Sequence, residues 1–300
     1  MTLDELAGGA PAIPRALIGG DSVLAREVQA RLAACGLLDP PVDGQFGPVS
    51  HWALDQFLRR HKLDPNQLDG LGARALLDPA TETDAYPLQL TTGTPLAERI
   101  VTRMRALDHW ICRHPECLNI VYVEGIDPDG TMNDDAPNLF NDLRLLVRIN
   151  RVGRPVIEGA WEATTEPGQY HTVIKPLDPR GAARIAFGQY KAWAVGPHPK
   201  SGTNSHEALV QTAAVTVHRD LNADYQRWGD LTYTGTFGIN QHWGYDMPYH
   251  DIGKASAGCL VGRTKAGHRE FMQLVRGDAR YRASQGYRFM TTVIDGTTLA

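Results

Sequence analysis

The sequence predicts an α+β fold in two parts, a small three-helix region followed by a larger, mostly β region. In the first part, Val28, Leu32 and Cys35 recur on one face of a helical pattern. In the second part, short β-type runs alternate with Gly, Pro and Asn punctuation, which is typical of mostly β domains. A chain of 300 residues is long enough to form two domains and to bury a sizeable core.

The helical region is organised around two glycine-containing turns. The first helix begins at Asp21, and the turn Val42–Ser50 follows it. Ser50 is expected to cap the second helix, because a serine oxygen can accept from the first free backbone N–H groups. The turn chemistry recurs at Leu68–Gly72, before a third helix at Ala73–Leu77. Helix, turn and helix therefore repeat within one small unit.

Composition shifts predict the boundaries between the parts. Residues 1–18 contain Ala, Gly and Pro and are expected to form a flexible tail. Residues 19–80 form the helical domain, and residues 81–96, rich in Pro and Thr, form a linker. Residues 97–300 form the second domain, with a core at about 138–296.

The second domain is expected to open with one helix at Leu96–His114 and to contain another at Thr264–Leu274. Short apolar runs between turn residues predict the strands. They are Ile120–Glu124, Leu145–Ile149, Val156–Trp161, Ala213–His218, Gly235–Asn240 and Phe289–Ile294.

Composition excludes several classes of partner. The hydrophobic fraction of 42% and the charged fraction of 21% are ordinary for a globular protein. The net charge of -4 argues against a large basic surface for nucleic acid. Because no apolar run approaches the roughly 20 residues that cross a bilayer, no membrane span is expected.

The most informative motif sets His242 ahead of a Ser-x-Gly-Cys turn that ends at Cys259. A thiol attacks only as thiolate, so it needs a neighbouring base, and a histidine can supply one. The small residues around Cys259 allow a tight turn that exposes sulfur and directs backbone N–H groups at a developing oxyanion. On chemistry alone, a buried, inert cysteine is an equal alternative.

This pattern resembles the L,D-transpeptidase (YkuD-type) catalytic domain, whose signature is a histidine followed by Ser-x-Gly-Cys. Sixteen residues separate His242 from Cys259, and Ile252-Gly253-Lys254-Ala255 leads into the turn. Further back, Asn141–Ile149 and Val152–Val156 are similar to the opening hairpin of the family, and Glu162–Gly168 to its Thr-Pro-x-Gly loop. Many members have His where Ala257 stands and Arg where Val261 stands.

The resemblance implies roles for particular residues. Cys259 would be the nucleophile and His242 the general base, with the backbone N–H groups of Gly258 and Cys259 as oxyanion donors. Ser256 would shape the loop. The residues expected to contact the substrate are Trp243, Gly244, Tyr245 and Arg263. No cofactor and no metal are expected, because a cysteine acyl-transfer reaction needs neither.

The first part resembles the three-helix peptidoglycan-binding domain found on wall hydrolases. The likeness covers about residues 20–78 and includes both Asp-Gly turns. Aromatic residues on these helices, Trp52 and Phe57 among them, are expected to pack in the core, because aromatic side chains on helix faces usually do. Peptidoglycan is therefore the expected partner.

Together these resemblances predict a cysteine enzyme that acts on the stem peptide of the bacterial cell wall. With water as the acceptor it is a lysin-like hydrolase, an L,D-peptidase, and with an amine it is a transpeptidase that forms crosslinks or exchanges the terminal D-amino acid. A non-catalytic wall-binding component of a phage or injection particle is the remaining alternative. Action in the wall or periplasm is expected. Met1–Ala7 lacks the features of a secretory signal, which favours the hydrolase and predicts phage-type delivery, another export route or a trimmed chain.

Other constellations compete with this interpretation. A zinc site or a disulfide is conceivable among His109, Cys112, His114 and Cys117, although their spacing is not that of a standard structural site. Asp220–Asp224 matches the first half of an EF-hand loop, but Tyr225 stands where glycine is needed. Three further histidines compete with His242 as the base, namely His218, His250 and His268.

Overall fold

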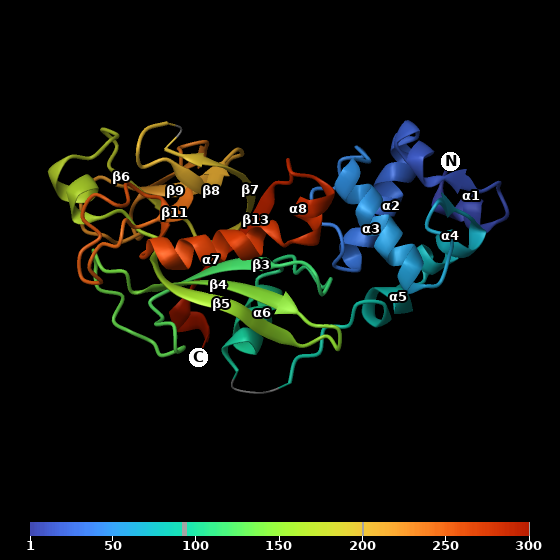
Figure 1. Ribbon diagram of the computed structural model, residues 1–300, viewed down its shortest axis with the longest axis horizontal. Helices are drawn as coiled ribbons and strands as arrows, with labels where there is room; N and C mark the ends of the chain where they lie inside the picture. The colour runs from blue at the N-terminus through green and yellow to red at the C-terminus, as the bar shows by residue number, and fades with distance from the viewer. Residues whose placement is uncertain (92–94, 200, 300) are drawn as a thin grey trace.

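A computed structural model describes residues 1–91, 95–199 and 201–299 of the chain. A helical unit lies at one end of the molecule and a larger, β-rich unit at the other, as Figure 1 shows. The predicted α+β fold in two parts is thus confirmed. Part of the predicted linker, residues 92–94, lies outside the described residues. Within the described ranges, no helix is both long enough and apolar enough to cross a membrane.

The helical unit is built from capped helices around an apolar core. Asp21 accepts hydrogen bonds from the backbone N–H groups of Val23 and Leu24, and Asp69 accepts one from Gly72. These side chains satisfy donors that the helix itself leaves free. Ser50 lies inside the second helix, which begins at Pro48, so the predicted Ser50 cap is wrong. The helices are α1 (Leu3–Ala7), α2 (Ser22–Ala34), α3 (Pro48–Arg60), α4 (Gly70–Leu77) and α5 (Pro79–Asp84).

The first 20 residues belong to this unit. Thr2 and Glu5 form a reciprocal capping box on α1, and Leu3 and Leu6 are buried in the core of the helical unit. The strand β1 (Ile13–Pro14) pairs with β2 (Gln67–Leu68), and a 3₁₀ helix, η1 (Arg15–Gly20), follows. The expectation of a flexible tail over residues 1–18 is therefore wrong, because its leucines supply part of the core.

The β-rich unit is a closed barrel. Its strands follow one another in the order β11, β12, β5, β4, β3, β13, β7, β8. Their bounds are β3 (Asn119–Glu124), β4 (Asp142–Ile149), β5 (Pro155–Thr164), β7 (Gly188–His198), β8 (His206–Gln211), β11 (Gln241–Trp243), β12 (Leu260–Gly262) and β13 (Phe289–Asp295). Because β3 pairs with both β4 and β13, the barrel begins at Asn119 and not near residue 138.

Two predicted elements differ from the structure. The run Gly235–Asn240 is not one strand, since β10 (Leu231–Gly235) ends and β11 begins around a loop in which Gly238 has a φ of 78°. The predicted helix Leu96–His114 is shorter: α6 covers Leu96–Ala106. Asp108 then takes a positive φ of 53°, which directs the chain away from the helix axis.

A second, smaller sheet and several helices complete the described part of the β-rich unit. The sheet contains β10, β9 (Val215–Asp220) and β6 (Ala182–Ile185), in that order. Helix α7 (Lys265–Arg276) follows the cysteine loop and is capped by Thr264, in agreement with the predicted helix. The remaining helices are α8 (Ala279–Ala283), the π-helical turn η2 (Tyr170–Ile174) and η3 (Gly296–Leu299).

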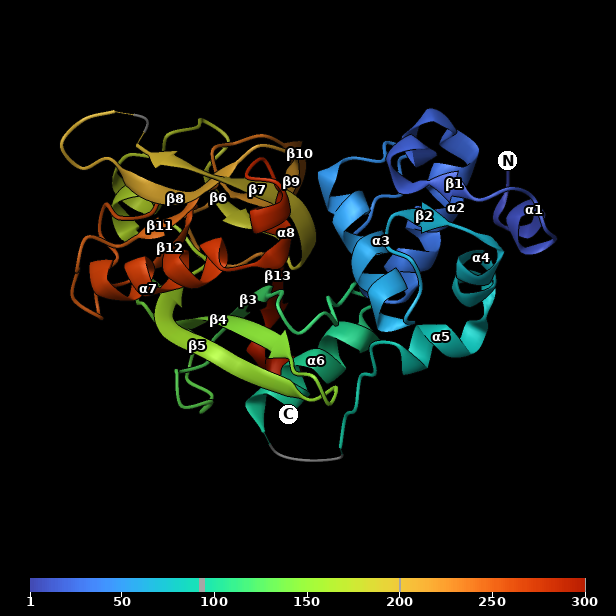
Figure 2. The same cartoon turned by 45° about the vertical axis from the view of Figure 1, so that its right-hand side comes forward.

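The two units pack against each other. The segment after α6 reaches the helical unit, where the Trp110 indole donates to the Ala33 carbonyl at 3.0 Å. Asp39 is buried and lies 2.7 Å from the Lys191 ammonium, and it accepts from the Tyr287 hydroxyl at 3.0 Å. Figure 2 shows α8 beside α3 at this junction. The segment around residues 81–96 is therefore not the only connection between the units.

Candidate active site

The cysteine loop is held by hydrogen bonds between its own residues. Ser256 Oγ accepts from the Gly258 N–H at 3.1 Å and donates to the Cys259 carbonyl at 2.9 Å. Gly258 has a φ of 121°, and a Cβ there would lie 2.4 Å from the Ala183 carbonyl oxygen. Only glycine fits this position, because both the backbone conformation and the space exclude a side chain. Ser256 and Gly258 thus fix the turn that presents the thiol.

Cys259 is half-buried, and its thiol contacts backbone groups. The Asn240 N–H lies 3.4 Å from Sγ, and Sγ donates to the Gly238 carbonyl at 3.4 Å. Burial raises the pKa of Cys259 to about 11, although the Asn240 N–H acts in the opposite direction. The sulfur is therefore a neutral thiol near pH 7, and a base must take its proton when it reacts.

His242 lies beside the cysteine loop because β11 runs parallel to β12, with His242 opposite Val261. Its Nδ1 is 2.7 Å from the Trp243 carbonyl oxygen. Since a carbonyl only accepts, Nδ1 carries the proton and Nε2 is free to accept one. Burial lowers the pKa of His242 to about 3, with a further contribution from His198. The imidazole is therefore neutral near pH 7, with Nε2 available as an acceptor.

Cys259 and His242 line one pocket of about 420 Å³. Its charged lining comprises Asp178, Arg219 and Lys254, and Lys254 Nζ lies 4.2 Å from the centre of the Tyr170 ring. Apolar and aromatic side chains such as Leu177, Phe237 and Tyr245 line other parts of it. A pocket of this kind, with a nucleophile, a base and a few charges, is suited to a short peptide.

A second histidine lies next to the predicted base. The His198 ring stacks on His242 with 4.3 Å between centroids and 23° between planes, and His198 lines the same pocket. Asn240 accepts from the Gln211 N–H through Oδ1, so its Nδ2 donates to His198 Nδ1 at 3.0 Å. His198 therefore carries its proton on Nε2. Sequence reasoning missed this residue, because the β7–β8 hairpin that places it leaves no local signal.

Of the four residues predicted to contact the substrate, Tyr245 lines the pocket. Trp243 stacks on His206, with 3.7 Å between ring centroids, and faces α7 rather than the thiol. Gly244 bonds through its N–H to the Gly262 carbonyl. Arg263 pairs with Glu162 and donates to the Met247 carbonyl. The sequence placed all four near the site, but three of them support neighbouring strands and loops.

The competing histidines are separated by the fold. His268 is buried on α7, where Nδ1 lies 3.1 Å from the Arg144 guanidinium and Nε2 bonds to the Glu207 carbonyl. These contacts hold His268 away from the thiol pocket, whose lining does not include it. His250 is exposed, and neither it nor His218 lines the thiol pocket. Among the four histidines weighed from the sequence, only His242 reaches the pocket of Cys259.

The residues considered as alternative metal ligands make other contacts in the structure. Cys112 and Cys117 are free and buried at the junction of the units, and Cys117 Sγ lies 3.9 Å from His114 Nδ1. The Asp220 carboxylate accepts from the backbone N–H groups of Asp224 and Tyr225, so it closes a turn. Within the described residues, no group of three or more His, Cys, Asp or Glu is arranged to hold a metal ion.

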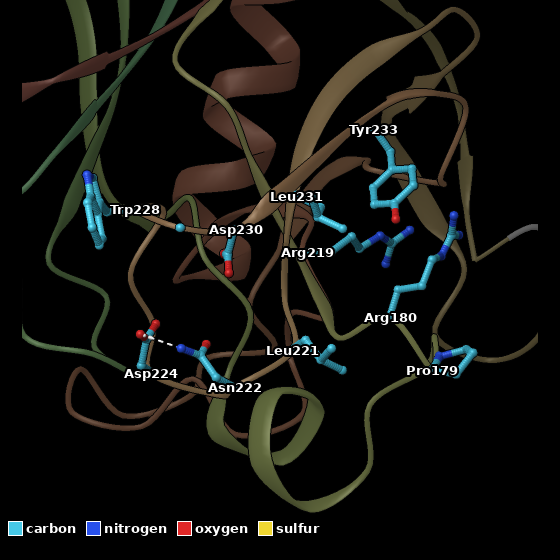
Figure 3. Close-up of a pocket in the computed structure, with 11 residues that line it drawn as sticks. Pro179, Arg180, Arg219, Leu221, Asn222, Asp224, Trp228, Asp230, Leu231 and Tyr233 are labelled. Carbon is cyan, nitrogen blue, oxygen red and sulfur yellow. Dashed lines mark hydrogen bonds between the residues drawn. The ribbon is translucent and has the colours of Figure 1, made fainter.

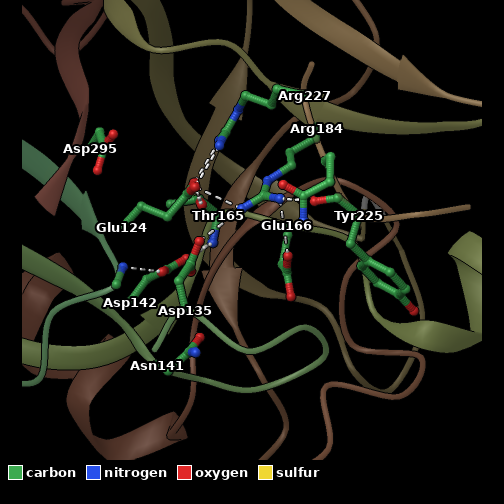
Figure 4. A network of polar contacts seen from close by, with 12 residues as sticks. Glu124, Asp135, Asn141, Asp142, Thr165, Glu166, Arg184, Tyr225, Arg227 and Asp295 are labelled. Atoms are coloured by element: carbon green, nitrogen blue, oxygen red, sulfur yellow. Dashed lines mark hydrogen bonds and ion pairs between the residues drawn. The ribbon is translucent and has the colours of Figure 1, made fainter. Parts of the chain in front are cut away.

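Figure 4 shows a network of charged side chains, most of which are buried. Its members are Glu124, Asp135, Asp142, Glu166, Arg184 and Arg227, which we call the charged network. Glu124 lies 2.7 Å from Arg184 Nη2 and 2.6 Å from Arg227 Nη2. Although burial opposes it, the two guanidinium groups lower the pKa of Glu124 to about 2. Burial raises the pKa of Glu166 to about 8.

The network connects directly to the site. Gly168, which follows Glu166 in the loop after β5, donates its N–H to the Ser256 carbonyl at 3.0 Å. On β6, Ala183 lines the thiol pocket and contacts the Gly258 backbone, whereas the next residue, Arg184, joins the network. Successive residues of a strand point to opposite faces, so one short strand supports both.

Comparison with known proteins identifies the first unit. Residues 22–66 match the sequence model of the family described as "Putative peptidoglycan binding domain". No curated protein matches the chain. The helical region thus contains a peptidoglycan-binding domain, and the chain acts at the cell wall.

Two solved structures are also similar to the chain. One is a fused Zn-dependent amidase/peptidase/peptidoglycan-binding domain-containing protein from Clostridium acetobutylicum ATCC 824, with a TM-score of 0.27 and 11% identity over 90% of this chain and 94% of that one. The other is the L,D-transpeptidase (residues 123–326) from Xylanimonas cellulosilytica DSM 15894, with a TM-score of 0.21 and 14% identity over 90% and 92%. Likenesses this distant carry no argument about the chemistry of the second unit.

Proposed function

We propose that the β-rich unit is a cysteine acyl-transfer enzyme that acts on the stem peptide of peptidoglycan. One observation carries the proposal: Cys259 and His242 line one pocket, with His242 Nε2 free to accept a proton. The peptidoglycan-binding domain of the same chain supports the substrate class. The resemblance of the His and Ser-x-Gly-Cys motif to L,D-transpeptidases supports the bond attacked, in which an L-centre precedes D-Ala.

The reaction proceeds in two acyl transfers. His242 Nε2 takes the thiol proton as Cys259 Sγ attacks the peptide carbonyl, and a tetrahedral oxyanion forms. The Trp243 carbonyl, which accepts from Nδ1–H, stabilises the imidazolium. His242 then gives the proton to the leaving amine, the C–N bond breaks, and a thioester to Cys259 remains. The Cys259 N–H is the proposed oxyanion donor, since the Gly258 N–H bonds to Ser256 Oγ.

The neutral resting state has a chemical consequence. Because burial raises the pKa of Cys259 and lowers that of His242, an ion pair does not form spontaneously near pH 7. Proton transfer and attack must therefore be coupled on bound substrate, whose developing oxyanion compensates the imidazolium charge. This property would also protect the thiol from unproductive alkylation between turnovers.

The acceptor of the acyl group decides between hydrolysis and transpeptidation. Water gives an L,D-peptidase, whereas an amine gives a crosslink or an exchanged terminal D-amino acid, and both reactions use the same thioester. Mass spectrometry of purified muropeptides, incubated with the protein in the presence and absence of a D-amino acid, tests the proposal. Loss of a terminal residue supports hydrolysis, and its replacement supports exchange. Unchanged muropeptides in both arms would contradict the proposal.

Metal dependence provides a second test. A thiol acyl transfer needs no metal ion, so EDTA should leave the muropeptide reaction intact. A zinc hydrolase would lose activity and recover it with zinc. Loss and recovery of this kind would overturn the mechanism and direct attention to His114 and Cys117 at the junction of the units.

A further inference from the structure

A second pocket, of about 570 Å³ and drawn in Figure 3, shares a lining residue with the thiol pocket. It lies between the segment that follows β9, which continues into β10, and the residues Pro179 and Arg180. Arg219 lines both pockets, and Asp178 lines the thiol pocket one residue before Pro179 begins the lining of the second. A ligand that fills one pocket is therefore in position to continue into the other.

Three large apolar side chains that line the second pocket are mostly exposed to solvent. Trp228 is 92% exposed, Leu221 72% and Leu231 70%. Figure 3 shows Trp228 at one end of the pocket and Tyr233 at the other, with Leu231 between them. A tryptophan ring in water, beside other apolar groups and a cavity, is typical of a surface that binds a ligand with a flat apolar face.

The polar groups of this pocket favour a neutral ligand that donates hydrogen bonds. Arg180 and Arg219 both face Asp178, at 2.7 and 3.4 Å, so their charge is already compensated. In contrast, Asp230 Oδ2 is buried and has no hydrogen-bond partner among the described residues. Together with Asp224, it would repel an anionic ligand and accept from hydroxyl or amide N–H groups.

These observations define the ligand class. A flat apolar face combined with several hydroxyl and amide donors describes an N-acetylated hexosamine better than a peptide carboxylate. We propose that the second pocket binds the glycan strand of peptidoglycan while the thiol pocket holds the stem peptide. This inference rests on the proposed function for its biological setting. One substrate could reach both sites, since the two pockets share Arg219 and an extended stem peptide, at about 3.3–3.6 Å per residue, joins the sugar to the scissile bond.

Binding of a sugar oligomer tests the inference independently of catalysis. N-acetylglucosamine tetramer is titrated into the full-length protein, and into Trp228→Ala and Asp230→Asn, by calorimetry. We expect Trp228→Ala to weaken binding by roughly tenfold, the scale of one aromatic contact. Val152→Ala is the matched control, because Val152 is 60% exposed in the turn between β4 and β5 and does not line the pocket. Binding that is unchanged in Trp228→Ala would overturn the inference.

Turnover separates this inference from the proposed function. For wild-type protein, a disaccharide-linked tetrapeptide should have a lower KM than the free tetrapeptide, and Trp228→Ala should remove that difference without changing turnover of the free peptide. If neither peptide reacts but the sugar oligomer still binds through Trp228, the proposed function fails and the glycan site stands. If the free tetrapeptide itself binds through Trp228, the pocket is a peptide site and the inference is wrong.

Discussion

The thiol pocket and the charged network lie on opposite faces of β6, and the groups at their centres differ in charge. In the pocket, Cys259 and His242 are neutral, because burial penalises their charged forms. In the network, Glu124 stays ionised because two guanidinium groups surround it. Glu124 is therefore charged in the resting protein, where it contributes to the structure around the cysteine loop. The Cys259–His242 pair becomes charged only during the reaction, when substrate is bound.

This difference predicts distinct consequences for substitutions in the two regions. Changes to Cys259 or His242 should reduce turnover with little effect on unfolding, since neither residue forms an ion pair in the described structure. Changes in the network should reduce the free energy of unfolding, since a buried charge without its partner is costly.

The strongest test is Cys259→Ala. We expect a loss of turnover of at least about a hundredfold, because the nucleophile is removed. The free energy of unfolding should change little, because the loop is held by Ser256 and Gly258 rather than by the thiol. Muropeptide turnover and urea unfolding measure the two quantities. Cys35→Ala, in the core of the helical unit, is the control and should show the reverse pattern.

Retention of full turnover in Cys259→Ala would contradict the proposed chemistry. It would favour the alternative of a non-catalytic wall-binding component. Alkylation gives a related measurement: the iodoacetamide rate of the free protein should be slow at neutral pH and should rise towards pH 11, because the raised pKa keeps the thiolate fraction low. A rate that is already maximal at neutral pH would show that the thiol is ionised, contrary to this account.

The second prediction concerns the base. His242→Ala should reduce turnover by about 10²–10⁴-fold, the usual contribution of a general base. His198→Ala should have a smaller effect, since His198 stacks on His242 and is held by Asn240. The control is His250→Ala, an exposed histidine that does not line the pocket. Equal losses in all three variants would leave the assignment of His242 without support.

The two regions also differ in how far the sequence could predict them. The pairing of His242 with Cys259 was predicted because the two stand in one motif, and adjacent parallel strands bring them to one pocket. No local sequence pattern predicts the charged network, since Glu124 and Arg184 are far apart in the sequence and meet only when the barrel closes. Contacts of this kind depend on strand order, which short apolar runs do not specify.

The helical unit was easier to predict, because most of its elements depend on local sequence. Its caps and turns are local, so the start of α2 and the end of α4 were predicted closely, although α4 begins at Gly70 and not at Ala73. The error at residues 1–18 was avoidable, because Thr2-x-x-Glu5 is a capping-box pattern and Leu3 and Leu6 share a face. The bend at Gly238 could not be predicted, since the composition of this segment is typical of a strand. In the structure the bend brings the Gly238 carbonyl to the thiol.

The third prediction tests the charged network. Glu124→Gln removes the partner of Arg184 and Arg227, and breaking a buried pair in this way costs about 3–5 kcal/mol of the free energy of unfolding. Urea unfolding near neutral pH measures the loss. In the wild type, the contribution of Glu124 is present above its ordinary pKa and is lost as the pH falls towards 2, because its folded-state pKa is lowered. A variant as stable as the wild type would show that the network is not a stabilising contact.

The fourth prediction concerns Glu166 and has the smallest effect. Burial raises its pKa to about 8, so the folded protein holds this proton more tightly than the unfolded chain does. The stabilising contribution is complete below the ordinary carboxyl pKa and is lost as the pH rises through about 8. Glu166→Gln keeps the neutral form at every pH, so its free energy of unfolding should fall less than that of the wild type between about pH 5.5 and 8.5.

The expected difference between Glu166→Gln and the wild type is on the order of a few kcal/mol at most, since one pKa unit corresponds to about 1.4 kcal/mol. Asp142, with its pKa raised to about 6, acts in the same direction and remains in the variant, so some decline should persist. Glu158→Gln, which removes only a partly exposed pair with Arg148, is the control and should leave the pH dependence unchanged. If wild type and Glu166→Gln lose stability in parallel, Glu166 is ionised in the folded protein. The charged network would then hold its charges fully paired, and the contrast with the thiol pocket would be sharper than proposed.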